Sequence, residues 1–131
     1  MAKTEPSMDA WLAEARASEQ ASKCGMFLIH NGVVRESAKA QVREGQDMPA
    51  VAQVEFSYDA AGLEAALEEA LTWDGVYYVR AWLNEGALNV GDTIMYVLVG
   101  ADIRPRCIDA LQKLVGHIKN DLVVEKEIYV E

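Results

Sequence analysis

Three stretches of the chain carry apolar residues at helical spacing. The first predicts a helix over residues 8–21, and Ser7 is placed to cap it. Asp59 is placed to cap the second helix, and Pro105 suits the first turn of the third, which Asn120-Asp121 should end. The predicted buried stripes are Leu63, Ala66, Leu67, Ala70 and Leu71 in the second helix, and Ile108, Leu111, Leu114, Val115 and Ile118 in the third.

Five stretches rich in β-branched, aromatic or alternating apolar residues predict strands. They are residues 24–30, 51–58, 76–83, 93–99 and 122–130. Asn31-Gly32 is expected to end the first strand, and residues 84–92, which include Gly86 and Gly91, are expected to form a turn or short loop. Residues 93–99 are almost continuously apolar, so this strand is expected to be buried on both faces.

The order of the predicted elements is αββαββαβ, which indicates the fold class. It predicts an α+β sandwich with a mixed, largely antiparallel sheet, in a single domain of residues 1–131 whose N-terminal helical region spans 1–22. Residues 36–50 are polar and contain Gly45 and Pro49, so they are predicted to form a mobile loop.

Composition and charge narrow the classes of function. The chain has 131 residues, of which 51% are hydrophobic and 25% charged, and its formal net charge is -9. Such an acidic chain is a poor match for nucleic acid or an anionic membrane, although a basic pocket inside an acidic surface remains compatible with it. The N-terminus is polar and no apolar run is long enough to span a membrane, so a cytoplasmic protein is expected. Cys24 and Cys107 are expected to be small buried thiols, and neither a disulfide framework nor a zinc site.

Two lysines flank the turn between the third helix and the last strand. Lys119 lies in the last turn of the helix, where a cation can simply stabilise the helix dipole. Strand alternation places Lys126 on a face with Leu122, Val124, Ile128 and Val130. Either this face is partly exposed and Lys126 extends to water, or the lysine points into a pocket. In the second case, the two side chains are expected to converge on one site.

Other polar residues add weaker signals. Arg35 follows a glycine turn, where it can reach an anionic ligand, and Arg104 opens the third helix, where an anion would satisfy both the arginine and the helix N–H groups. His30 ends an apolar strand, which favours a structural role, and His117 is expected to be partly exposed beside an apolar stripe. No dinucleotide-binding, Walker, zinc-protease or nucleophile-elbow motif is present.

Four segments carry distinctive motifs: the stretch 27–35 ending in Gly-Val-Val-Arg, Val54-Glu55-Phe56 before a helix, residues 86–92 with the pattern Gly-x-Leu-x-x-Gly-Asp, and residues 104–126 with the lysine spacing. These segments resemble the MoaE family, the large catalytic subunit of molybdopterin synthase. They cover most of the chain from about Cys24 to Ile128. The resemblance implies a hammerhead-type α/β fold, a homodimer of large subunits, and a ubiquitin-like small subunit at each end.

The family's reaction is sulfur transfer, and it is expected to need no metal or other cofactor. The small subunit carries a C-terminal thiocarboxylate, and its sulfur converts cyclic pyranopterin monophosphate to molybdopterin. By resemblance, Lys119 and Lys126 are the catalytic lysines. Val34, Arg35 and Arg104 match substrate-binding positions, as does Ile103, where the family has a histidine.

The replacement of that histidine by Ile103 leaves alternatives open, because isoleucine cannot donate a hydrogen bond to phosphate. The first hypothesis is an active synthase subunit. The second is a non-catalytic homologue that binds a ubiquitin-like protein or a pterin without turnover. The third is an acidic interaction domain in which the lysines are structural.

Overall fold

The computed structural model describes residues 3–38, 43, 45 and 49–130 of the chain. In chain order, its elements are helix α1 (Met8–Arg16), the 3₁₀ turn η1 (Ala21–Lys23), strands β1 (Met26–Val33) and β2 (Val51–Tyr58), helix α3 (Ala60–Ala70), strands β3 (Val76–Leu83), β4 (Gly86–Asn89) and β5 (Thr93–Ala101), helix α4 (Arg104–His117), the π turn η2 (Ile118–Leu122) and strand β6 (Val123–Tyr129). The predicted loop over 36–50 lies largely outside the described residues.

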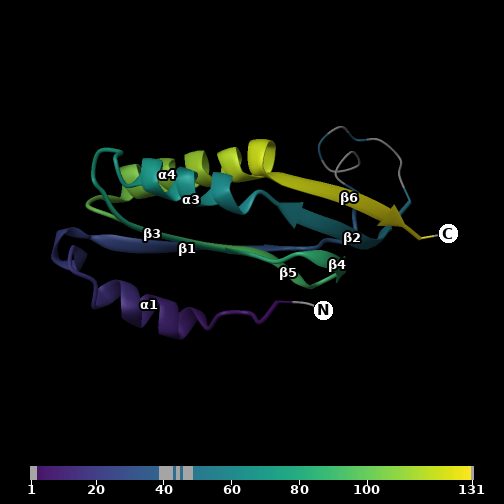
Figure 1. The fold of residues 1–131 in the computed structure, drawn as a ribbon, viewed down its shortest axis with the longest axis horizontal. Coiled ribbons are helices and arrows are strands. Elements are labelled where there is room, and N and C mark those ends of the chain that lie inside the picture. The colour runs from purple at the N-terminus through teal and green to yellow at the C-terminus, as the bar shows by residue number, and fades with distance from the viewer. Residues whose placement is uncertain (1–2, 39–42, 44, 46–48, 131) are drawn as a thin grey trace.

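The strands form two three-stranded sheets. The first has the order β1-β5-β3 and the second β4-β2-β6, and every pairing between described strands is antiparallel. The α+β class and the antiparallel character are therefore confirmed, while no parallel pair supports the mixed sheet that was expected. In Figure 1, α1 lies against one side of the first sheet, α3 and α4 lie against the other, and β2 and β6 continue beyond the helices.

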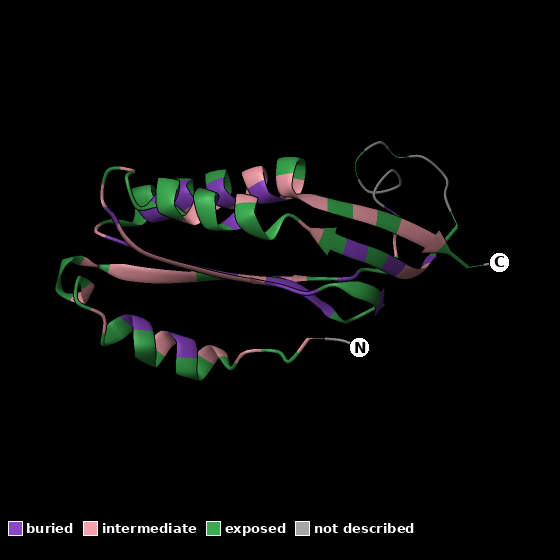
Figure 2. Ribbon diagram, in the orientation of Figure 1, coloured by how far each residue is buried: buried purple, intermediate pink, exposed green. Residues whose placement is uncertain are grey.

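Strand β5 is the centre of the first sheet, and its residues are buried on both faces as predicted. Leu98 packs against Trp11 and Ala15 of α1, whereas Val97 and Val99 face the larger core on the opposite side. Figure 2 shows the same division, since buried residues on the helices lie on the sides that face the sheet. The alternation of the strand therefore joins two apolar layers through one central element.

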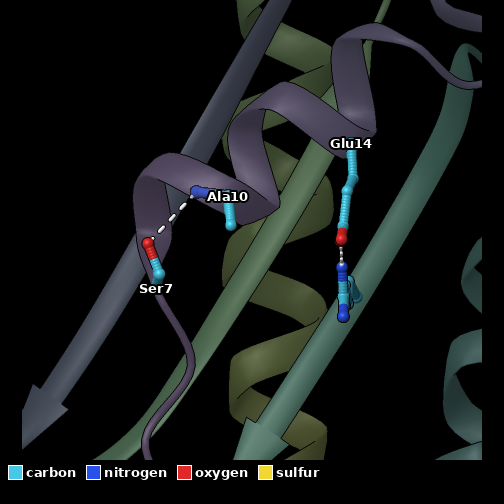
Figure 3. Close-up of polar contacts among 4 residues, drawn as sticks. Ser7, Ala10 and Glu14 are labelled. Atoms are coloured by element: carbon cyan, nitrogen blue, oxygen red, sulfur yellow. Dashed lines mark hydrogen bonds and ion pairs between the residues drawn. The ribbon is translucent and has the colours of Figure 1, made fainter.

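Helix α1 is capped at its start and joined to the sheet by an ion pair. The Ala10 N–H donates to Ser7 Oγ at 3.2 Å, which confirms the predicted cap, and Glu14 forms an ion pair with Arg80 of β3 (Figure 3). The helix ends at Arg16, well before residue 21. One physical reason is that the Ser18 hydroxyl donates to the Ala15 carbonyl at 2.7 Å, in competition with a further helical turn.

Two predicted breaks in the strands are wrong. Strand β1 runs through Asn31-Gly32, because these residues pair with Tyr96 and Met95 of β5, and the irregularity comes only between Gly32 and Val33. Residues 84–92 contain strand β4, which pairs with β2 and buries Leu88 almost completely. In both places, pairing with a distant strand overrides local turn-forming residues.

Helix α4 lies over the β1-β5-β3 sheet and leads to the candidate site. Its buried residues are Cys107, Ala110 and Leu114, and Ile118 in the following turn is also fully buried. Ile108, expected in the stripe, is 44% exposed. No described helix is long and apolar enough to cross a membrane.

Candidate functional site

Lys119 is positioned by the π turn that follows α4. Ile118 anchors this turn in the core with no exposed surface, so the next side chain emerges at the edge of the core. The Lys119 side chain is 27% exposed, and its Nζ lies 2.8 Å from Glu125 Oε1 on β6. A π turn is uncommon and often occurs at functional sites. The turn and the ion pair together hold the ammonium group in one place.

An open cavity of about 650 Å³ lies beside Lys119, between β1, β5 and α4. Its apolar wall includes Leu28, Met95, Leu111 and Val115. Its polar residues include four that bear or can acquire positive charge: His30, Arg35, Arg43 and Lys119. No carboxylate is among its lining residues in the part of the chain that the structure describes. The acidic chain therefore contains a basic cavity, which suits a small anionic ligand.

Arg35 and Val34 follow β1 directly. The Val34 N–H donates to the Asp92 carbonyl at 2.9 Å, which fixes the backbone, and Val34 is buried. Arg35 lines the large cavity, and its Nε donates to the Ser37 carbonyl at 3.0 Å. Both residues also line an adjoining pocket of about 40 Å³ with Lys119 and Glu125. Arg35 and Lys119 thus share one site.

Lys126 lies elsewhere. The register of β6 on β2 sets Lys126 opposite Glu55, while Glu125 lies opposite the buried Phe56. Glu125 therefore faces inward and Lys126 faces water, in a separate surface pocket that includes Ser57 and Gly86. Val124, on the same face as Lys126, is 67% exposed. The first alternative for Lys126 is correct, and within the chain the two lysines do not converge on one cavity.

Arg104 and Ile103 lie at the opposite end of α4 from Lys119. Ile103 is the N-cap residue and is 52% exposed, and Arg104 opens the helix as an exposed residue. The helix has 14 residues, so at 1.5 Å per residue its ends are about 20 Å apart. Within one chain, these residues do not reach a small ligand at Lys119.

Three residues in or beside the cavity were not predicted as parts of a site. His30 was assigned a structural role, Arg43 lay in the predicted loop, and Glu125 was only a neighbour of the lysines in sequence. Burial, and secondly the nearby Lys119, hold the pKa of His30 below its ordinary value. The alternation of β1 was the available signal, since it sets His30 on the same face as Leu28 and Gly32.

Comparison with known proteins settles the family. The sequence matches the family profile described as MoaE protein over residues 3–121. The chain belongs to the MoaE family. This is the family of the molybdopterin synthase large subunit, which acts in molybdenum cofactor biosynthesis, so the resemblance seen in the sequence is confirmed. No curated protein matches the sequence significantly.

Solved structures of MoaE proteins share the fold of this chain. A molybdopterin biosynthesis MoaE protein from Burkholderia ambifaria is 21% identical, with a TM-score of 0.72 over 98% of this chain and 84% of that one. Molybdopterin synthase from Staphylococcus aureus is 18% identical, with a TM-score of 0.67 over 83% of this chain and 77% of that one. In a complex of subunits 1 and 2 of molybdopterin-converting factor from Helicobacter pylori, the similar chain is 17% identical, with a TM-score of 0.66 over 95% of this chain and 81% of that one.

The chemical capacity of this MoaE cavity follows from its charges. Arg35 can present a planar pair of N–H donors to an oxyanion, and Lys119 supplies a compact positive charge. Glu125 neutralises part of that charge and keeps the lysine oriented. Among the described residues, no group of three or more His, Cys, Asp or Glu side chains is arranged to hold a metal.

Proposed function

We propose that the chain is the large subunit of a molybdopterin synthase. It would transfer sulfur from the C-terminal thiocarboxylate of a ubiquitin-like small subunit to cyclic pyranopterin monophosphate, and so form molybdopterin. The observation that carries the proposal is the basic cavity in which Arg35 and Lys119 lie together, in a chain of the MoaE family. Lys119 is the proposed catalytic lysine, and Val34 and Arg35 are proposed substrate contacts.

The charges of the cavity agree with both ligands of this reaction. The pterin substrate carries a phosphate, and the small subunit presents an acyl group on which negative charge develops during transfer. Preorganised cations stabilise such charge more effectively than water does, because they need no reorganisation. A large subunit of this kind needs a partner, and the Helicobacter pylori structure that resembles this chain is a complex of two subunits.

The proposal also includes a homodimer. The proposed roles of positions 103, 104 and 126 need it, because one chain by itself does not bring them to the Lys119 cavity. Lys126 is a proposed catalytic lysine on the outer face of β6, and Arg104 is a proposed substrate contact beside Ile103. Both cations lie on exposed surface, where a second subunit can approach them. Equilibrium sedimentation of the purified chain would measure its oligomeric state.

A second candidate is a non-catalytic MoaE homologue that binds the small subunit or the pterin without turnover. Ile103 favours it, because its exposed apolar side chain cannot bind phosphate. The position of Lys126 outside the Lys119 cavity favours it as well.

Reconstitution separates these candidates. The chain is mixed with thiocarboxylated small subunit and cyclic pyranopterin monophosphate, and molybdopterin is quantified. Product that is lost in Lys119→Ala and retained in Lys113→Ala would support the synthase. Lys113 is a matched control on α4, since its Nζ lies over the Trp73 ring at 4.2 Å and it lines neither cavity beside Lys119. Absence of product with the small subunit still bound would favour the non-catalytic homologue, and failure to bind either ligand would contradict both.

A further inference from the structure

His30 rises from the inner face of β1 into the cavity that holds Lys119. It lies opposite Val97 of β5, which is fully buried, and two residues after Leu28 on the same face. The imidazole itself is half-buried and lines the cavity. Within the part of the chain that the structure describes, its ring nitrogens have no hydrogen-bond partner. A polar ring at an apolar cavity wall is thus available to a ligand.

The charged groups around His30 are nearly all positive. Lys119 of η2 is close enough to act on it electrostatically, and Arg35 and Arg43 line the same cavity. The residues that α4 and β5 contribute to the lining carry no charge. On β6, Glu125 is engaged with Lys119 at 2.8 Å, and both Glu125 and Glu127 line the small adjoining pocket and not this cavity.

We infer that His30 is an anion-binding residue of this cavity, where it contacts the phosphate group of a small phosphorylated ligand together with Arg35 and Lys119. The inference rests on the proposed function for the identity of that ligand, but its chemistry is that of any tetrahedral dianion. It assigns to β1 the histidine function that the family resemblance places at position 103, where this chain has isoleucine at the far end of α4.

Binding at His30 should be linked to proton uptake. Before an anion binds, burial and secondly Lys119 hold the pKa of His30 below its ordinary value, which favours the neutral ring. A bound dianion offsets the charge of Lys119 and accepts a hydrogen bond from the imidazolium, and both effects favour the protonated ring. The pKa of His30 must therefore rise when the anion binds, and the anion must bind more tightly at pH 5.5 than at pH 8.

The chain offers an internal control, because it contains two histidines. His117 lies outside the cavity lining and pairs with Asp121 at 2.8 Å. The experiment is an NMR titration of both imidazoles in the full chain from pH 5 to 8, at constant ionic strength, with and without sulfate. Sulfate is the probe because it is a tetrahedral dianion that does not itself titrate in this range. The variant His117→Gln assigns the two signals.

The expected result is that sulfate raises the pKa of His30, while the His117 signal serves as the internal control. His30→Gln should bind sulfate roughly tenfold more weakly at pH 5.5, since it loses one charge-assisted hydrogen bond, and should lose most of the pH dependence. His117→Gln should bind as the wild type does. A circular dichroism spectrum and an unfolding curve of His30→Gln establish that the variant is folded.

Three outcomes would overturn the inference: no sulfate binding, sulfate binding with no change at His30, or equal affinity of wild type and His30→Gln at pH 5.5. A parallel titration with a short peptide that ends in a free carboxylate tests the other anion that the proposed reaction brings to the site. A response of His30 to this peptide and not to sulfate would also overturn the phosphate assignment. None of these readouts needs turnover, so an inactive chain in the reconstitution assay leaves the test of His30 valid.

Discussion

The ion pair between Lys119 and Glu125 makes a quantitative prediction about the variant Glu125→Gln. This change keeps the shape of the side chain and removes its charge. Exposed ion pairs contribute about 0–1 kcal/mol, whereas removing one partner of a fully buried pair costs about 3–5 kcal/mol. The Lys119 and Glu125 side chains are 27% and 14% exposed, so the pair lies between these limits, and the unpaired ammonium retains access to water.

We therefore expect Glu125→Gln to lower the free energy of unfolding by about 1–2 kcal/mol. For a chain of this length, each kcal/mol corresponds to about 3–4 °C, so the melting temperature should fall by about 3–8 °C. The same variant should bind sulfate several-fold more tightly, because the charge of Lys119 is no longer neutralised. Thermal unfolding followed by circular dichroism measures the first effect, and titration calorimetry measures the second.

A matched control lies in η2, the turn that also contains Lys119. Asp121→Asn removes the partner of His117 in a pair whose side chains are 41% and 62% exposed, and it should change the free energy of unfolding by less than about 0.5 kcal/mol. A double-mutant cycle with Lys119→Met isolates the coupling energy of the Lys119–Glu125 pair. Two results together would refute a stabilising ion pair. Glu125→Gln would melt within 1–2 °C of the wild type, which is roughly the range expected for the control, and the cycle would show no coupling energy.

Three further predictions test the core, the last strand and the cavity histidine. Leu114→Ala should lower the free energy of unfolding by about 2–5 kcal/mol in urea denaturation, because the side chain is buried and leaves a cavity; a smaller loss would contradict the packing of α4. Val123→Ser should cost about 1–2 kcal/mol and Val124→Ser less than about 0.5 kcal/mol, since Val123 packs on the core and Val124 is exposed; the reverse order would invert the faces of β6. The pKa of His30 is lowered in the folded state by burial and Lys119, so the unfolded chain binds more protons below about pH 6.5. The stability of the wild type relative to His30→Gln should therefore fall as pH decreases from 8 to 5 in urea denaturation, and a constant difference would show that His30 is unperturbed.

Local chemistry predicted most of the fold from the sequence. The cap at Ser7, the cap at Asp59 and the two strands Val51–Tyr58 and Val76–Leu83 all agree with the structure, because they depend on residues that are adjacent in the chain. Strand β4 was missed for the opposite reason. It has four residues and begins with a glycine, and it exists because it pairs with β2.

The site was predicted less completely than the fold. The family resemblance selected Arg35 and Lys119, and the structure sets both at one cavity. It also selected Lys126 and Arg104, which lie on other surfaces of the chain. His30 and Glu125 were not selected, since a histidine at the end of a strand and a glutamate in a final strand are ordinary in sequence. Their importance depends on which side chains the fold brings beside them.

The position of Lys126 on the outer face of β6 explains why the lysine spacing by itself was insufficient to predict the site. Alternation within a strand states which residues share a face, but it does not state which face is buried. That choice depends on the partner strand: β2 turns Val54 and Phe56 inward, and the register sets Glu127 and Glu125 opposite them. A shift of one residue in this register would bring Lys126 inward and expel Glu125. The ion pair of Glu125 with Lys119 opposes such a shift, so the contact that orients Lys119 also keeps Lys126 on the outer face.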